Sequence, residues 1–293
     1  MAKLVLKSRH RVMCGDSTSA QDVEHLMAGD AAVLLFTSPP YAQQRDYGIA
    51  KANVSDWDAL MRGVFGAAIV TPDAQILVNL GLVHRANEWV PYWETWIEWM
   101  RQQGWRRFGW YVWDQGPGLM GDWNGRFAPS HEFIFHFNKK TRRPNKTKEK
   151  KPENVKDKSG DAGLRTKDGE IKPVTNGAAF LSTHKIPDSV VRVARHHGAV
   201  QGGSHPAVFP VALAEEILAA FTQEGDPVFE PFGGSCTQVI AAERTGRRCF
   251  AMEIDPAYVD VACRRWRLAI GTEPVHARSG KTYSEMTDGA AQA

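Results

Sequence analysis

The sequence has few cysteines, no long apolar run and little excess of charge of either sign. Its four cysteines form no Cys-x-x-Cys pair and no metal-ligand spacing, which excludes a disulfide scaffold and indicates reduced thiols in an intracellular protein. No stretch approaches the roughly 20 apolar residues that cross a bilayer, and the N-terminal residues lack the apolar run of a secretory signal. The net charge of +3 says little about partners. With 293 residues, 43% of them hydrophobic, the chain can bury a large core.

Two parts of the chain show the pattern of buried parallel strands that end in loops. Residues 31–36 are consecutive apolar residues, and Pro39 and Pro40 end the run. In the C-terminal third, a strand, a glycine turn, a helix, a strand and another helix follow one another within a short stretch, which predicts a βαβ unit with a parallel pair. The first strand with its glycine turn is expected over residues 228–235, the first helix over 237–244, the second strand over 248–254 and the second helix over 256–270.

Nine of the ten tryptophans lie between residues 57 and 138. Trp89, Trp93, Trp96 and Trp99 follow helical spacing, which predicts one face of a helix that ends near Gly104. Core packing is the favoured interpretation of this stripe, and a base-stacking surface is the alternative.

Residues 139–172 are strongly basic, with thirteen Lys/Arg against six Asp/Glu and almost no large apolar side chains. Such a segment buries too little apolar surface to order itself, so it is expected to be mobile when free. It is either a solvated insertion or an arm that follows phosphates, because clustered Lys and Arg gain affinity by releasing counterions from nucleic acid.

The glycine turn of the βαβ unit predicts a nucleoside site. Gly233 and Gly234 let a ligand approach the backbone, and Glu253, at the end of the next strand, can accept bonds from both hydroxyls of a ribose. The sequence has neither the G-x-G-x-x-G motif nor the P-loop motif that phosphate chains require. A nucleoside without a phosphate chain, such as S-adenosylmethionine, therefore fits best.

The segment Ser38–Tyr41 (SPPY) predicts an amine-binding loop at the carboxyl end of a strand. Two prolines remove backbone donors and leave the Ser38 hydroxyl and nearby carbonyls as acceptors. These acceptors, beside the Tyr41 ring, suit a planar base with an exocyclic amino group. The alternative is an ordinary proline turn that closes a strand.

Together these segments resemble the DNA amino-methyltransferases, which methylate cytosine N4 or adenine N6 with S-adenosylmethionine. The catalytic motif precedes the cofactor motif, with a variable region between them, as in the β class. The resemblance spans roughly residues 10–270. The matching segments are Cys14–Ser17 (CGDS), Thr37–Tyr41 (TSPPY), His205-Pro206 with Pro210 and Leu213, Phe229–Ser235 (FEPFGGS) and Ala251–Asp255 (AMEID) with Tyr258.

The resemblance implies roles for individual residues and no metal. The implied catalytic residues are Ser38, Pro39, Pro40 and Tyr41. The implied cofactor-binding residues are Asp16, Thr37, His205, Pro206, Phe229, Pro231, Phe232, Gly233, Gly234, Ser235, Glu253 and Ile254. The basic segment coincides with the family's target-recognition region, and its implied DNA contacts are Lys139, Lys140, Arg142, Arg143, Lys146 and Lys148.

The family also implies an α/β fold with a doubly wound, mostly parallel, seven-stranded Rossmann-like sheet. We expect residues 1–138 to form the catalytic half, 139–198 the basic target-recognition insertion, 199–272 the cofactor-binding half and 273–293 a flexible tail. The implied substrate is double-stranded DNA whose target base is flipped out of the helix. A bacterial or phage-encoded cytoplasmic enzyme is expected. A homodimer and a separate endonuclease both stay open, as does an orphan enzyme without an endonuclease.

Two departures from the family pattern bear on function. Cys236 stands where the family commonly has another glycine, so we expect an altered turn. The catalytic motif begins with Ser38 instead of aspartate, and serine is more frequent in cytosine N4 enzymes. Cytosine N4 is therefore favoured, with adenine N6 as the alternative.

Other interpretations stay open. One is an amino-methyltransferase that acts on RNA or on a protein side chain, and another is an inactive nucleic-acid-binding relative. No cysteine follows a proline, which argues against a cytosine C5 enzyme. His131 and Glu132 precede an alternating strand and form a second candidate site, although the end of a strand is the favoured explanation. Asp114 could line the base pocket and is not placed in the catalytic set.

Overall fold

The computed structural model describes residues 3–6, 9–41, 54–118, 125–152, 163–173, 182–195 and 209–290. The chain divides into two compact units, one formed by Met1–Arg143 with Ser189–Ala293 and the other by Pro144–Asp188. In the smaller unit, two short antiparallel pairs are described. These are β9 (Lys148–Glu149) with β12 (His184–Lys185), and β10 (Gly163–Arg165) with β11 (Ile171–Pro173).

The larger unit contains a ten-stranded sheet with the order β13-β7-β8-β4-β3-β14-β15-β2-β1-β16. Among the described strands of this sheet, β8 and β1 run in the direction opposite to all the others. The predicted doubly wound, mostly parallel sheet is confirmed, and β13, β1 and β16 extend it at the two edges. The strands are β1 (Lys3–Leu6), β2 (His10–Cys14), β3 (Ala32–Thr37), β4 (Val70–Leu80), β7 (Arg106–Asp114), β8 (His131–Asn138), β13 (Val190–Arg192), β14 (Pro227–Glu230), β15 (Arg248–Glu253) and β16 (Val275–His276).

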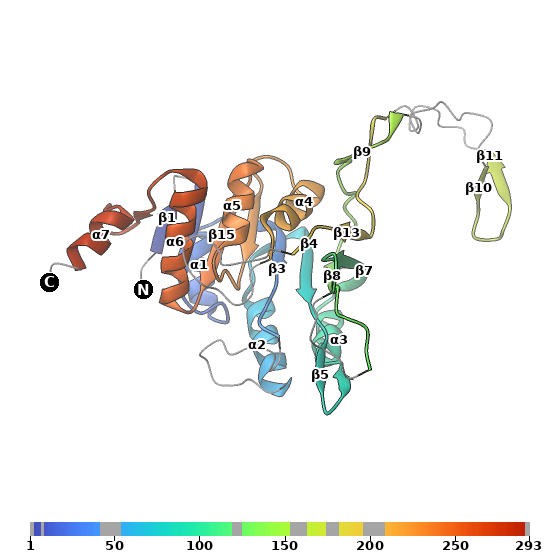
Figure 1. Ribbon diagram of the computed structural model, residues 1–293, viewed down its shortest axis with the longest axis horizontal. Helices are drawn as coiled ribbons and strands as arrows, with labels where there is room; N and C mark the ends of the chain where they lie inside the picture. Colours follow the sequence, from blue (N-terminus) through green and yellow to red (C-terminus); the bar gives the residue numbers. More distant parts are fainter. Residues whose placement is uncertain are drawn as a thin grey trace. The chain divides into compact units, whose positions relative to one another are not determined.

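Helices cover both faces of this sheet because its buried strands are apolar on both sides (Figure 1). Along β3, Leu34 and Phe36 belong to one core cluster and Leu35 to the other. The first cluster receives side chains from α4, α5 and α6, and the second from α1, α2 and α3. The helices are α1 (Ala20–Met27), α2 (Val54–Ala67), α3 (Glu94–Gln102), α4 (Val211–Phe221), α5 (Thr237–Arg244), α6 (Pro256–Ile270) and α7 (Tyr283–Ala290).

The tryptophan stripe belongs to the core, as predicted, except for its first member. Trp96 is fully buried and Trp93 is 6% exposed, next to the start of α3. Trp89 instead lies in β6 (Glu88–Val90), which pairs with β5 (Val83–Arg85), and is 56% exposed. The helix cannot reach back to Trp89 because Ala86 and Asn87 both have positive φ and form the turn of this hairpin.

The structure differs from the expected flexible tail. Val275–His276 pairs with β1 as β16, and Tyr283 at the start of α7 is buried in the first core cluster. The Glu273 carboxylate accepts hydrogen bonds from the backbone N–H and the hydroxyl of Ser284. Burial of the tyrosine ring and these hydrogen bonds give this short polar segment a defined place.

No helix in the described part of the chain combines the length and the apolar character that a membrane crossing requires.

His136 on β8 makes the stability of the folded protein depend on pH. Burial lowers the pKa of His136 from 6.5 to about 4, and its ring contacts Tyr111 Oη at 2.8 Å and Gln75 Oε1 at 2.9 Å. As the pH falls, the unfolded chain binds this proton at a higher pH than the folded chain does. The contribution of neutral His136 to the free energy of unfolding is therefore fully present above pH 6.5 and is lost as the pH falls toward 4. The loss from this group approaches about 3 kcal/mol. Urea unfolding at pH 7.5 and 4.5 measures it against His136→Gln, which lacks this titration; equal losses in both proteins would contradict the prediction.

Candidate active site

The candidate site lies at the carboxyl edge of the neighbouring parallel strands β3, β14, β15 and β2. Ser38 follows β3, the turn with Gly233 and Gly234 follows β14, Glu253 ends β15, and Asp16 follows β2. Parallel strands present their carboxyl ends at one edge, so residues from distant parts of the sequence meet there.

A buried carboxylate joins the loop after β3 to the glycine turn. Glu230 is 2% exposed, and its Oε1 accepts hydrogen bonds from Thr37 Oγ1 at 2.5 Å and from the Phe232 N–H at 3.0 Å. Gln238 Nε2 donates to Glu230 Oε2 and to the Phe36 carbonyl oxygen. Burial raises the pKa of Glu230 well above its ordinary value. The sequence patterns did not indicate these contacts of Glu230 and Gln238, although a carboxylate at the end of an apolar strand is a signal of such a network.

Glu253 organises the glycine turn. Its Oε2 accepts from the Gly234 N–H at 2.7 Å and its Oε1 from the Asp255 N–H at 2.9 Å. Burial raises the pKa of Glu253. A Cβ on Gly233 would lie 3.1 Å from the Met252 carbonyl oxygen, so the close packing of this turn favours glycine. Each carboxylate oxygen can accept a further bond, which leaves Glu253 able to bind hydroxyl groups.

The backbone conformation of Cys236 shows why glycine is common at this position in the family. Its backbone is left-handed, with φ 54° and ψ 45°, and it precedes the first residue of α5. This conformation costs a residue with a Cβ about 1–2 kcal/mol more than glycine, which is why glycine suits this position. The thiol is 3% exposed, and burial raises its pKa well above the ordinary value.

Some predicted cofactor residues do not present free side chains at this edge of the sheet. Phe229 is fully buried in the second core cluster, and the Thr37 hydroxyl donates to Glu230. Ser235 is 4% exposed, and both its hydroxyl and its carbonyl oxygen accept from Arg265 at 2.6 Å.

The other predicted cofactor residues have varied surroundings. Phe232 packs partly buried against the second core cluster, and the Pro231 carbonyl accepts from Ser17 Oγ at 2.6 Å. Asp16 Oδ1 accepts from the backbone and hydroxyl of Thr18, and Ile254 is 55% exposed. His205 and Pro206 lie outside the described residues.

The loop after β3 is held by side chains from other elements. Trp57 Nε1 donates to the Pro40 carbonyl oxygen at 2.7 Å, and this hydrogen bond fixes the backbone of the loop at Pro40. The Tyr41 ring lies so close to Gly81 that a Cβ on Gly81 would come within 2.8 Å of Tyr41 Cε2. The loop therefore depends on the tryptophan of α2 and on the missing side chain after β4.

A hydrogen-bond network surrounds Ser38 and Tyr41. Tyr41 Oη donates to Glu132 Oε2 at 2.7 Å, and Asn79 Nδ2 donates to the same oxygen at 2.6 Å. Asn79 Nδ2 also lies 3.2 Å from Tyr41 Oη and 3.4 Å from Ser38 Oγ. Burial and the Glu132 carboxylate raise the pKa of Tyr41 well above its ordinary value. Glu132 lies at the start of β8, in keeping with the favoured explanation from sequence, and its carboxylate also contacts Tyr41 and Asn79, a residue that the sequence patterns did not indicate.

The predicted DNA contacts are divided between the two units. In the larger unit, Lys139 Nζ lies 4.7 Å from the centre of the Trp105 ring, and Arg142 pairs with Asp226 at 3.6 Å. The Lys140 carbonyl accepts from Gln75. Arg143 is the last residue of the first segment of the larger unit, and Lys146 and Lys148 belong to the smaller unit.

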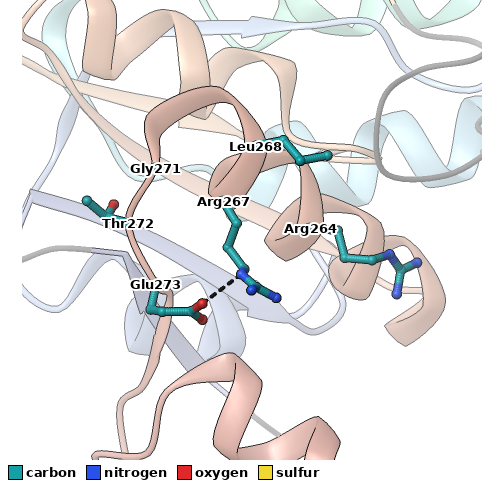
Figure 2. Close-up of a pocket in the computed structure, with 6 residues that line it drawn as sticks. All are labelled: Arg264, Arg267, Leu268, Gly271, Thr272 and Glu273. Carbon is teal, nitrogen blue, oxygen red and sulfur yellow. Dashed lines mark ion pairs between the residues drawn. The ribbon is translucent and has the colours of Figure 1, made fainter.

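A separate pocket lies at the C-terminal end of α6 (Figure 2). Because α6 starts at the carboxyl edge of the sheet and runs back, its last turn lies at the opposite edge from Glu253. Arg267 in this pocket pairs with Glu273 at 2.7 Å, so its charge is already compensated. The pocket is therefore not part of the candidate site. Its lining residues are Arg264, Arg267, Leu268, Gly271, Thr272 and Glu273.

In the residues that the structure describes, no group of three or more His, Cys, Asp or Glu side chains could hold a metal ion.

Comparisons with known proteins agree with this geometry. A model of the family described as "DNA methylase" matches residues 32–264. The Type II methyltransferase M.Cfr9I of Citrobacter freundii is 25% identical over 86% of this chain and 85% of that protein. The orphan methyltransferase M.BamHII of Bacillus amyloliquefaciens is 43% identical over 61 residues, which are 21% of this chain and 23% of that protein.

A solved structure supports the fold. The cytosine-N4-specific PvuII DNA methyltransferase superposes with a TM-score of 0.63 at 20% identity, covering 88% of this chain and 86% of that one. Since the family match covers most of the sequence and includes both the serine loop and the glycine turn, this chain belongs to the DNA methylase family of S-adenosylmethionine-dependent N4-cytosine and N6-adenine amino-methyltransferases.

Proposed function

We propose that the chain transfers a methyl group from S-adenosylmethionine to the exocyclic amino group of a base flipped out of double-stranded DNA, with cytosine N4 favoured. The observation that supports this proposal most is the hydrogen bond between Thr37 and Glu230, which connects the loop that holds Ser38 to the glycine turn at one edge of the sheet. Ser38 in place of aspartate favours cytosine, as does the likeness to the PvuII DNA methyltransferase, which is cytosine-N4-specific. Adenine N6 is the second candidate, because the same acceptors would hold its amino group.

The residues at this edge fit S-adenosylmethionine. Glu253 keeps acceptor capacity beyond its bonds to Gly234 and Asp255, so it can accept from ribose hydroxyls. Asp16 and the exposed Ile254 flank the same edge. When bound, the cofactor supplies an electrophilic methyl group on a sulfonium.

The chain itself positions the amine. Ser38 Oγ and the Pro39 carbonyl accept hydrogen bonds from the amino group, which draws its lone pair out of ring conjugation and directs it toward the methyl group. Tyr41 offers its ring to the base, while Trp57 and Gly81 keep the loop in place. The amine nitrogen would form a bond to the methyl carbon as the bond from that carbon to sulfur breaks; the sulfur would keep that electron pair, and the methylated amine would release one proton to solvent. No covalent intermediate is needed, so the site works by orientation and electrostatics.

Glu253→Ala is expected to weaken cofactor binding by about 1–3 kcal/mol, because ribose hydroxyls and two turn N–H groups lose their acceptor. Titration calorimetry with S-adenosylmethionine measures the change. Glu253→Gln is the matched control, since its amide oxygen can still accept one of these bonds, and it should lose less. Unchanged affinity in Glu253→Ala would remove this carboxylate from the cofactor site.

The basic residues predict a salt-dependent DNA affinity. Replacing Lys139, Lys140, Lys146 and Lys148 by glutamine should flatten the slope of log affinity against log salt by about 3–4, since each phosphate contact contributes about 0.9. Fluorescence anisotropy with a labelled duplex measures the slope. Arg278→Gln with Lys281→Gln, both exposed between β16 and α7, is the control. An unaltered slope in the fourfold variant would indicate that residues 139–172 do not contact phosphates and serve as a linker.

The proposed reaction is tested by its product. DNA incubated with the protein and S-adenosylmethionine is digested to nucleosides, which are identified by mass spectrometry. We expect N4-methylcytosine; N6-methyladenine would instead support the second candidate. Methyl transfer to RNA or protein alone, or to no substrate, would contradict the proposal.

A further inference from the structure

A buried arginine contacts the end of the glycine turn. Arg265 on α6 is 7% exposed, and its Nη1 donates to the carbonyl oxygen and the hydroxyl of Ser235, each at 2.6 Å, and to Thr237 Oγ1 at 3.0 Å. Among the described residues, these hydrogen-bond partners include no carboxylate. A buried arginine is usually paired with an acidic group, because a buried charge without a counter-ion is costly. The contacts with the turn are therefore what this side chain gains in its buried position.

These contacts lie on both sides of Cys236. Gly234 and Cys236 have positive φ, of 50° and 54°, and the Cys236 N–H donates to the Gly233 carbonyl oxygen at 2.6 Å. The Ser235 carbonyl belongs to the planar peptide group that turns when φ of Cys236 changes. Thr237, the first residue of α5, follows Cys236. Arg265 thus holds the peptide group before Cys236 and the side chain after it.

The conformation of Cys236 is one that its own side chain does not favour. A residue with a Cβ avoids the left-handed region, whereas glycine enters it readily. Cys236 precedes α5, and its side chain makes no capping hydrogen bond to the helix. The hydrogen bonds that Arg265 donates come from another element, α6, and they favour the conformation in which the Ser235 carbonyl and the Thr237 hydroxyl both face the guanidinium.

The same conformation affects the groups that face the cofactor in the proposed function. The Gly234 N–H donates to Glu253 Oε2 at 2.7 Å, and this hydrogen bond orients the carboxylate proposed to bind the ribose. One residue, Ser235, separates Gly234 from Cys236. A change in φ of Cys236 would move the Ser235 peptide group and, through it, the Gly234 N–H.

From these contacts, and resting on the proposed function, we infer that Arg265 is a positioning residue for the cofactor turn. It holds Cys236 in the left-handed conformation and so keeps the Gly234 N–H directed at Glu253. Arg265 acts through the turn. Its three hydrogen bonds compensate for the absence of a glycine at position 236, where the family commonly has one.

A double-mutant cycle on cofactor affinity tests this inference. In the protein with its native cysteine, Arg265→Met should weaken binding of S-adenosylmethionine about 5- to 30-fold, the factor that corresponds to the penalty of a left-handed residue with a Cβ. A Cys236→Ala background keeps the Cβ and should show the same loss. In a Cys236→Gly background the loss should fall below about threefold, because glycine needs less support. Titration calorimetry measures the three affinities.

The alanine and glycine backgrounds are matched to each other, since both lack the thiol and they differ in the Cβ alone. Equal fold losses in the cysteine, alanine and glycine backgrounds, or an unchanged affinity in Arg265→Met, would overturn the inference. If Arg265→Met does not fold, Arg265→Lys repeats the cycle, because a single ammonium group cannot span both sides of Cys236. Absence of cofactor binding by the unaltered protein would instead contradict the proposed function.

Trp266→Phe separates positioning from stability. Trp266 is the next residue of α6, it is buried, and its Nε1 donates to Thr272 beyond the end of the helix. The variant should lower the free energy of unfolding in urea and leave the affinity for S-adenosylmethionine within about twofold. If Trp266→Phe weakened cofactor binding as much as Arg265→Met does, the effect of Arg265 would be one of general stability and the inference would fail.

Discussion

Ser38→Ala is expected to lower kcat about 100-fold or more while changing the affinity for S-adenosylmethionine less than about twofold. The substitution removes the side-chain acceptor for the substrate amine. It leaves intact the bond between Thr37 and Glu230 and the bond between Trp57 and the Pro40 carbonyl, which hold the loop. Transfer of a tritiated methyl group to DNA measures turnover, and calorimetry measures cofactor binding.

Ser279→Ala provides a matched control for this prediction. Ser279 lies in the exposed turn between β16 and α7, where its hydroxyl contacts only local groups, His276 and the Lys281 N–H. This control should keep full turnover. If Ser38→Ala also kept it, Ser38 would have no part in the reaction and the proposed mechanism would fail.

Glu230→Leu is expected to lower the free energy of unfolding by about 3–5 kcal/mol. The change leaves the Thr37 hydroxyl, the Phe232 N–H and one of the two N–H groups of the Gln238 amide without their acceptor, and each unpaired buried donor costs about 1–3 kcal/mol. It also releases the catalytic loop from the glycine turn, so methyl transfer should fall with stability. Urea unfolding at neutral pH measures the first effect.

Two further variants identify the cause of that loss. Glu230→Gln keeps an amide oxygen as acceptor and should lose less than half as much, because only part of the network is broken. Glu224→Leu removes an exposed carboxylate from the loop between α4 and β14 and should have little effect. A loss below about 1 kcal/mol in Glu230→Leu would show that the buried carboxylate does not hold the two segments together.

Local patterns predicted many of the elements correctly. α5 and α6 have the bounds expected from sequence, since the ends of α6 are marked by local chemistry. Asp255 caps its first turn and Gly271 adopts the left-handed conformation that ends it. The start of α3 was missed because a hairpin turn with positive φ at Ala86 and Asn87 carries no glycine or proline to indicate it.

The motifs by themselves predicted the chemistry proposed for this protein: two glycines and Glu253 for a nucleoside, and a serine with two prolines and an aromatic ring for an amine. Only the tertiary structure decided which side chains contact these motifs. Glu132 lies 91 positions from Tyr41, and Glu230 lies 193 positions from Thr37. A carboxylate acts through the donors that it faces, and here those donors arrive from distant strands whose carboxyl ends share one edge of the sheet. No local sequence pattern predicts these contacts, because the order and direction of the strands in the sheet bring the residues together.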